Sequence, residues 1–333
     1  MAPMRLLRTL LMCAAVLAAA AGGGTWWWLE RPLVLRGEAA EFDIEPGTSP
    51  RRVADIVAQA GVQVQPALFY AWLRVSGASR YLKAGNYSVE GAVTPRQLAR
   101  RLVEGEETQF AVTIVEGWTF AQMRAALARA EHLKPLTRDL AAADIMAQLG
   151  RPGQGFEGRF SPDTYHYGKG ASDLTVLRRA LHTMDRRLAA AWAVRQPAVQ
   201  LRTPEEALTL ASIIEKETGK GSDRALISGV FHNRLRIGML LQTDPTVIYG
   251  MGDEFDGNLR RRDLQTDTPW NTYTRAGLPP TPIALPGKAA LLAAVQPAST
   301  KALYFVARGN GSSQFSATLD EHNRAVNKYQ RGK

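Results

Sequence analysis

The chain has 333 residues, of which 45% are hydrophobic and 22% charged, so it is long enough for one large or two modest folded domains and is not intrinsically disordered. Its 41 Lys and Arg residues exceed its 31 Asp and Glu residues, and the net charge of +10 suits either solubility alone or an anionic partner such as a phospholipid surface or a cell-wall polymer. The basic residues form no nucleic-acid-binding motif, so no nucleic-acid partner is expected, and the single cysteine, Cys13, excludes a disulfide framework and a CxxC site.

Residues 1–29 predict a cytoplasmic tip followed by a membrane anchor. Arg5 and Arg8 precede Thr9–Leu29, a stretch of 21 uncharged residues that is long enough to cross a bilayer core of about 30 Å as a helix. Positive charge before the span places the N-terminus in the cytoplasm and the rest of the chain outside, and Trp26–Trp28 are typical of an interfacial aromatic belt. The alternative is a cleaved signal peptide, since the alanines just before residue 22 offer a small-residue cleavage site. In both cases the bulk of the protein is exported.

Residues 30–40 predict a linker, and three related segments follow it. Each segment contains a short alternating strand, a glycine turn and a helix with an N-cap. The turns are expected at Gly47, Gly91 and Gly117, and the N-caps at Ser49, Thr94 and Thr119. Apolar residues recur four and eight positions after each cap, which is helical spacing. Residues 41 to about 130 therefore predict repeated strand–turn–helix units, unless common capping chemistry has produced the similarity by chance.

The remaining segments complete the pattern of an α+β protein. Residues 131–150 are Ala-rich and predict a helix, residues 151–170 predict a loop, and residues 172–195 predict one amphipathic helix. From residue 221 onward the pattern changes to short helices, turns and a strand at ALYFVA near the C-terminus.

The segment TPEEALTLASIIEKETG has the clearest helix signals and carries two neighbouring glutamates. Thr203 and Glu206 form a capping box at its start. At the helical spacing of about 100° per residue, Glu217 falls in the middle of the apolar stripe, whereas Glu215 falls at the edge of that stripe. The polar side of the helix is expected to hold Lys216, Thr209, Glu205 and Ser212.

This difference in position makes Glu217 the better candidate for a general acid. A carboxyl group on an apolar face is desolvated, which raises its pKa, and the carbonyl ends in the last turn of the helix act in the same direction. A raised pKa is what a proton donor near neutral pH requires. The alternative is that the helix ends before Glu217, which would leave this side chain at the surface.

Other polar and aromatic residues predict a groove for sugars, because rings stack on sugar faces while amides and hydroxyls bind sugar substituents. The candidates are Gln242, Thr243, Asp244, Tyr249, Asn271, Thr272 and Tyr273, each of which singly also suits a turn or a packing position.

A hydrolytic glycosidase would need a second carboxylate, from Glu215, Glu157 or Asp244. A lyase needs only one, because a hydroxyl of the sugar can be the nucleophile. Motifs of zinc proteases, P-loop proteins and serine hydrolases are missing from the sequence, and His232 is expected to be structural.

Four blocks of sequence closely resemble the YceG-like family of endolytic murein transglycosylases. They are ASIIEKET, FHNRLRIGMLLQTDPTVIYGMG, NTYTRAGLPPTPIALPG and LYFVARGNGSSQFSATLDEHN, and FEGRFSPDTYHY resembles a further block. The resemblance extends over nearly the whole chain in the same order and spacing.

The resemblance implies a location, a reaction and a division into domains. It implies one N-terminal helix in the inner membrane and a catalytic domain in the periplasm, over residues 111–330. Residues 41–110 match a small LysM-like subdomain, a glycan-binding type of module. The implied reaction cuts nascent peptidoglycan strands between N-acetylmuramic acid and N-acetylglucosamine without hydrolysis. It leaves a 1,6-anhydromuramyl end and limits strand length, with penicillin-binding protein synthases as partners.

The resemblance also assigns roles to residues. Glu217 is the implied catalytic residue, acting first as acid on the glycosidic oxygen and then as base on the muramyl C6 hydroxyl, and no metal or cofactor is needed. Residues expected to bind or position the substrate are Glu215, Thr218, Gln242, Asp244, Tyr249, Asn271, Tyr273 and Glu157. Two alternatives stay open: a hydrolytic muramidase with a second carboxylate, and a non-catalytic peptidoglycan-binding scaffold that recruits synthases.

Overall fold

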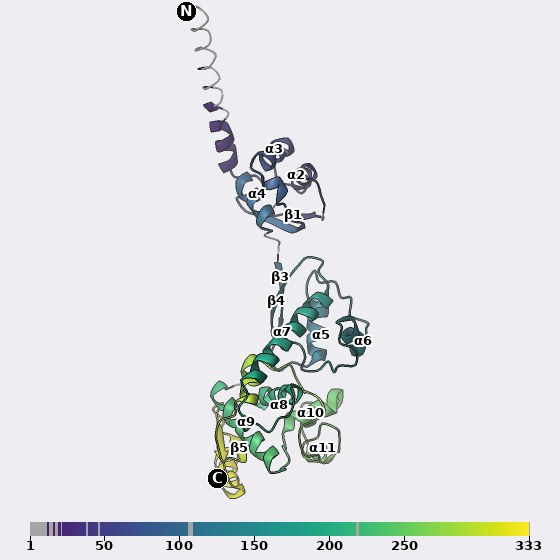
Figure 1. Cartoon of the computed structure of the whole chain (residues 1–333), viewed down its shortest axis with the longest axis vertical. Coiled ribbons are helices and arrows are strands. Elements are labelled where there is room, and N and C mark those ends of the chain that lie inside the picture. The colour runs from purple at the N-terminus through teal and green to yellow at the C-terminus, as the bar shows by residue number, and fades with distance from the viewer. Residues whose placement is uncertain are drawn as a thin grey trace, which may run out of the picture. The chain divides into compact units, whose positions relative to one another are not determined.

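The computed structural model describes residues 12, 16, 19–20, 22–37, 39–45, 47–105, 109–217 and 220–332. Within this part of the chain, no helix combines the length and apolar character needed to span a bilayer. Much of the predicted anchor, Thr9–Leu29, lies outside the described residues, as does Thr218. The chain divides into two compact units, Met1–Phe110 and Ala111–Lys333, and mixes helices with small sheets, as the α+β prediction requires (Figure 1).

The first unit is a two-stranded sheet covered by helices. Strand β1 (Ala39–Ile44) pairs antiparallel with β2 (Gly85–Glu90), and Phe42 stacks on its cross-strand partner Tyr87 with ring centroids 5.7 Å apart. The helices are α2 (Pro50–Gln59), α3 (Pro66–Val75) and α4 (Pro95–Glu104), with a 3-10 turn η1 at Ala78–Arg80. Apolar side chains of the sheet and of these helices form one buried core.

The three predicted strand–turn–helix units are confirmed. They are β1–α2, β2–α4, and β3 (Gln109–Ile114) followed by α5 (Phe120–Arg129). Gly47, Gly91 and Gly117 have positive φ angles, and Ser49, Thr94 and Thr119 each accept a hydrogen bond from the backbone three residues later. The third segment nevertheless belongs to a different sheet, because β3 pairs with β4 (Asp163–Gly168). The repeat therefore shares its local chemistry, and not its tertiary partners.

The second unit holds most of the helices. They are α5, α6 (Ala142–Gln148), α7 (Asp173–Ala193), α8 (Pro204–Glu217), α9 (Gly221–Arg236), α10 (Asp244–Met251), the 3-10 turn η2 (Gly252–Glu254), α11 (Arg261–Gln265), α12 (Lys288–Val295) and α13 (Leu319–Tyr329). Strands β5 (Tyr304–Ala307) and β6 (Ser313–Ser316) form an antiparallel hairpin, so the predicted strand at ALYFVA is confirmed. The helix predicted over residues 172–195 is confirmed as α7.

Two segment predictions are wrong. Of residues 131–150 only α6 is helical, because buried Asp173 draws the preceding segment into turns by accepting hydrogen bonds from the Thr137 amide and hydroxyl. The predicted loop 151–170 contains strand β4, whose side chains Tyr165 and Tyr167 are buried on one face. Both errors involve partners that are distant in sequence, which a local pattern does not contain.

Helix α8 is buried nearly all around, so its predicted polar side is wrong for Thr209 and Ser212. Helices α7, α9, α10 and α12 pack against it, and every residue from Ala207 to Ile214 is buried (Figure 1). The Ser212 hydroxyl donates to the Thr209 carbonyl at 2.7 Å and accepts from the Ile283 amide at 3.0 Å. A helix enclosed in this way has a fixed end, and that end carries Glu217.

We expect Ser212→Ala to lower the free energy of unfolding by about 1–3 kcal/mol, because it leaves the buried Ile283 amide without its acceptor. Urea unfolding followed by circular dichroism measures this change. Thr209→Val is the matched control, since the Thr209 hydroxyl bonds only within the helix, to the Glu205 carbonyl at 3.0 Å, and its loss should cost less. Equal costs for the two variants would contradict the buried Ser212–Ile283 contact.

Candidate active site

A groove of about 680 Å³ opens at the C-terminal end of α8. Its walls come from the start of α10, the residue Tyr273, strand β5 and one side of α13. The residues predicted from the sequence that line this groove together are Glu217, Gln242, Thr243, Asp244 and Tyr273. Gln242, Thr243 and Asp244 lie 25 to 27 positions after Glu217 in the sequence and Tyr273 lies 56 positions after it, so folding is needed to assemble them.

Glu217 is the last residue of α8, so the helix does not end before it. Burial raises the pKa of its carboxyl group to about 7, and this effect outweighs the others. The Thr243 hydroxyl donates a hydrogen bond to Glu217 Oε1 and lowers the pKa, the charge of Asp244 raises it, and the charge of Arg234 lowers it. Near neutral pH a large share of Glu217 therefore keeps its proton and can donate it into the groove.

Arg234 on α9 ties the walls of the groove together. Its Nε donates to the Leu303 carbonyl at 2.7 Å, and its Nη1 donates to the Leu241 carbonyl at 2.8 Å. Its guanidinium lies over the Tyr304 ring, 5.3 Å from the centroid, and the side chain is buried. Arg234 is not among the residues predicted from the sequence, because all these partners are backbone carbonyls and a ring brought together only by the fold.

Residues 240–244 and 271–273 are hydrogen-bonded to each other on one side of the groove. The Gln242 amide donates to the Thr272 carbonyl at 3.1 Å, and the Thr243 amide donates to the Thr272 hydroxyl at 3.1 Å. The Tyr273 hydroxyl donates to Asp244 Oδ1 at 2.5 Å. Gln242 has a φ of 47°, a left-handed conformation that non-glycine residues adopt mainly where surrounding contacts impose it. The predicted groove residues thus occupy a locally constrained segment.

Glu215 points away from the groove. Its Oε2 accepts from the Gly287 amide at 2.8 Å, its Oε1 lies 3.5 Å from Arg224, and its side chain is only 6% exposed. Burial raises its pKa, the charge of Glu116 adds to this, and Gly287 and Arg224 oppose it. Of the two roles expected for Glu215, binding or positioning, its contacts favour positioning: it joins α8 to the start of α12 and positions the helix that carries Glu217.

Glu157 and Tyr249 also lie outside the groove. Glu157 Oε1 accepts from the Phe120 amide at 3.0 Å at the start of α5, and Glu157 Oε2 accepts from the Tyr249 hydroxyl at 3.2 Å. Glu157 is 6% exposed, and burial raises its pKa to about 7 although the Phe120 and Gly158 amides oppose the shift. The predicted substrate contacts of Glu157 and Tyr249 are replaced by a buried link between α5 and α10.

Asn271 is fully buried and binds backbone groups on both sides of it in the sequence. Its Nδ2 donates to the carbonyls of Asp263 and Leu264 in α11 and of Thr266 directly after it, the shortest of these contacts being 2.6 Å. Its Oδ1 accepts from the Tyr273 amide at 2.8 Å. The predicted contact of Asn271 with substrate is therefore wrong, because a side chain with no exposed surface cannot reach it. Asn271 instead fixes the backbone of Tyr273, which does line the groove.

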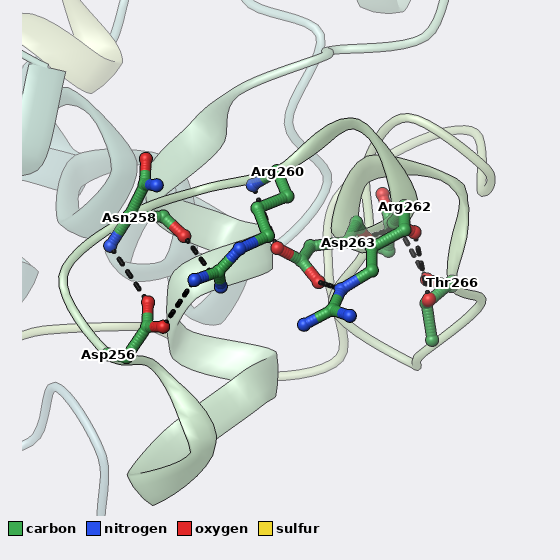
Figure 2. Close-up of polar contacts among 7 residues, drawn as sticks. Asp256, Asn258, Arg260, Arg262, Asp263 and Thr266 are labelled. Carbon is green, nitrogen blue, oxygen red and sulfur yellow. Dashed lines mark hydrogen bonds and ion pairs between the residues drawn. The ribbon is translucent and has the colours of Figure 1, made fainter.

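Arg260 and Arg262, at the start of α11, are paired with carboxylates. Figure 2 shows Arg260 reaching Asp256, at 2.6 Å, while the Arg260 amide donates to Asp263 at 2.8 Å (Figure 2). Arg262 lies 3.4 Å from the other oxygen of Asp263. These contacts fix the start of the short helix whose other end Asn271 closes.

Comparisons with known proteins agree on one family. A family model described as the YceG-like family matches residues 42–328. The chain is 30% identical over 312 residues to an endolytic murein transglycosylase of Bacillus subtilis, covering 86% of this chain and 84% of that protein. It is 25% identical over 316 residues to an endolytic murein transglycosylase of Streptococcus pneumoniae, covering 85% of this chain and 57% of that protein. A crystal structure of a YceG-like protein from Listeria monocytogenes aligns with a TM-score of 0.55 at 29% identity, covering 86% of this chain and 98% of that one.

Two substitutions beside Glu217 are expected to move its pKa in opposite directions. Thr243→Val removes a hydrogen bond to the carboxylate and should raise the pKa, whereas Asp244→Asn removes a neighbouring negative charge and should lower it. A carbon-13 NMR titration of the Glu217 carboxyl, identified by its loss in Glu217→Gln, measures both shifts.

Asp267→Asn is the control for this titration, because Asp267 pairs with Arg275 at an exposed position and does not line the groove. It should leave the Glu217 titration unchanged. Shifts of the same sign in the two groove variants would contradict the placement of Thr243 and Asp244 around this carboxyl.

Proposed function

We propose that this chain, which belongs to the YceG-like family, is an endolytic murein transglycosylase in which Glu217 is the catalytic acid and base. Glu217 is assigned this role because its carboxyl group lines the groove and burial raises its pKa to about 7. The curated relatives supply the substrate class, the murein glycan.

The reaction needs one carboxyl group with a movable proton. Glu217 donates its proton to the glycosidic oxygen as the bond from that oxygen to muramyl C1 breaks. The Glu217 carboxylate then takes the proton of the muramyl C6 hydroxyl while the C6 oxygen bonds to C1, which closes the 1,6-anhydro ring. The carboxyl ends in its starting state, and no water is consumed. A group with a pKa near the working pH suits both transfers.

The groove offers limited support for a hydrolase. Among the described residues that line it, the only carboxylate besides Glu217 is Asp244, since Glu215 and Glu157 are buried elsewhere. Asp244 accepts from the Tyr273 hydroxyl at 2.5 Å, which is a positioning contact for that ring. A hydrolytic muramidase would have to use Asp244 to activate water. In the proposed lyase reaction, Asp244 transfers no proton.

The proposal extends to the cellular setting. The uncharged stretch Thr9–Leu29 after two arginines supports a single-pass anchor in the inner membrane with the remainder in the periplasm. The strand and helix content of the first unit supports a LysM-like subdomain over residues 41–110. Synthases of the penicillin-binding protein class fit as partners, because an enzyme that ends nascent strands must act where they are made.

Product analysis by mass spectrometry on uncrosslinked glycan strands tests this function. Wild type should give 1,6-anhydromuramyl ends, and Glu217→Gln should lose about 100- to 10,000-fold in rate, the range for removing a general acid. Glu215→Gln is the neighbouring control on the same helix. It should retain the same products, with any loss traceable to lower stability.

The other outcomes separate the alternatives. Reducing ends that disappear in Asp244→Asn would identify a hydrolase with Asp244 as its second carboxylate. A Glu217→Gln variant that binds glycan and functions in cells like wild type would identify a non-catalytic scaffold. Loss of cleavage in Glu215→Gln alone, with the fold intact, would contradict the choice of glutamate.

A further inference from the structure

Helix α3 in the first unit has an apolar outer face. Phe69 and Leu73 of this helix are fully buried in the core. On the outside, Leu68 is 48% exposed and Val75 is 84% exposed, and Ala71 between them is exposed as well. A surface helix of a soluble domain normally presents polar side chains there. This face therefore has no partner within the first unit that accounts for its composition.

The apolar surface continues past the end of the helix into a shallow groove. Trp72 and Tyr81 line this groove of about 310 Å³, together with Val103 and Arg96. Tyr81 is 66% exposed. Leu68, Ala71, Trp72, Val75 and Tyr81 are together called the α3 face below.

The α3 face lies next to the point where the chain enters the first unit. Arg96, which lines the groove, pairs with Glu30 at 2.9 Å. Leu29 is 3% exposed, and Trp28 packs against the core of the unit. The end of the helix over residues 22–30 is thus fixed to this unit by an ion pair and by buried side chains.

The residues just before this junction carry the same chemistry. Trp26 is 64% exposed and Trp27 is 60% exposed, and the guanidinium of Arg31 lies over the Trp27 ring at 5.1 Å. Trp and Tyr concentrate at the level of lipid headgroups, where their rings are half in the apolar phase. Exposed arginines beside such rings can meet lipid phosphates.

We infer that the α3 face rests on the surface of the lipid bilayer, where it forms one aromatic and apolar belt with Trp26 and Trp27. Exposed Arg74 and Arg80 lie on or directly after α3 and suit anionic headgroups. This inference rests on the proposed membrane anchor, and it adds that the first unit itself is a membrane-contacting module. The unit would then be held in one orientation at the membrane and not swing freely on a linker.

A lipid surface fits the α3 face better than a saccharide does. Leu68, Ala71 and Val75, three of the five residues of this face, offer a sugar neither a ring to stack on nor a hydrogen bond, so only Trp72 and Tyr81 could contact one. The two arginines of the groove are paired, Arg96 with Glu30 at 2.9 Å and Arg100 with Glu104 at 2.6 Å. Moving these exposed aliphatic and aromatic side chains into the interface is favourable because it removes apolar surface from water.

Site-specific labelling of the full chain in vesicles tests the inference. Cys13 is replaced by Ser, and Val75→Cys is labelled with an environment-sensitive fluorophore in vesicles of phosphatidylcholine and phosphatidylglycerol. Glu45→Cys, exposed at the end of β1 and outside the α3 face, is the matched control. We expect a blue-shifted emission at position 75 that lipids carrying a quencher in the headgroup region extinguish, and neither effect at position 45.

The outcomes distinguish this inference from the anchor on which it rests. If the protein floats with the vesicles but the label at position 75 reports water, the anchor stands and the contact of the α3 face is overturned. If the protein does not float, the anchor and the contact both fail. A response of the position 75 label to isolated glycan strands without vesicles would overturn the lipid assignment in favour of a saccharide site.

Discussion

The enclosure of α8 is the constraint on which the candidate site depends. Four helices pack around it, and even its Thr209 and Ser212 hydroxyls are buried, so the packing fixes the position of its C-terminal end, which carries Glu217. The last residue of the helix, Glu217, lines the groove. The cost of burying a charge there raises the pKa of the Glu217 carboxyl group to about 7. The folded state binds this proton more tightly than the unfolded chain, so Glu217 takes away stability as pH rises from about 4.5 to about 7. The site therefore holds a proton donor at the expense of stability.

Three glutamates of the second unit have raised pKa values with desolvation as the largest cause, and only their surroundings separate their roles. Glu157 accepts two backbone amides and a tyrosine hydroxyl, and Glu215 accepts an amide near an arginine. Glu217 has one hydroxyl donor and faces the groove. A perturbed pKa alone would not choose among them, whereas access to a cavity does.

Local signals in the sequence were sufficient for much of the fold. Ser49, Thr94 and Thr119 cap their helices as predicted, and the glycine before each has the positive φ that its turn requires. The apolar stripe also separated Glu217 from Glu215 by helical geometry. The features that the sequence did not reveal depend on partners elsewhere in the chain. Asn271 binds the carbonyl of Thr266, and Arg234 binds carbonyls on two segments. Strand β4 forms by pairing with β3. Every residue has a backbone carbonyl, so a side chain that binds backbone does not require a particular residue type as its partner. The sequence therefore contains no pattern that predicts such a contact.

Glu217 holds the proton needed for cleavage near neutral pH because burial raises the pKa of its carboxyl group. The dependence of kcat/KM on pH for release of 1,6-anhydromuramyl ends measures this most directly, since kcat/KM reports the ionisation of the free enzyme. If Glu217 is the proton donor, kcat/KM should fall on the alkaline side with a midpoint of about 7. A fall centred near 4.5, the ordinary value for a solvated glutamate, would contradict it, as would a rate that stays flat into alkaline solution.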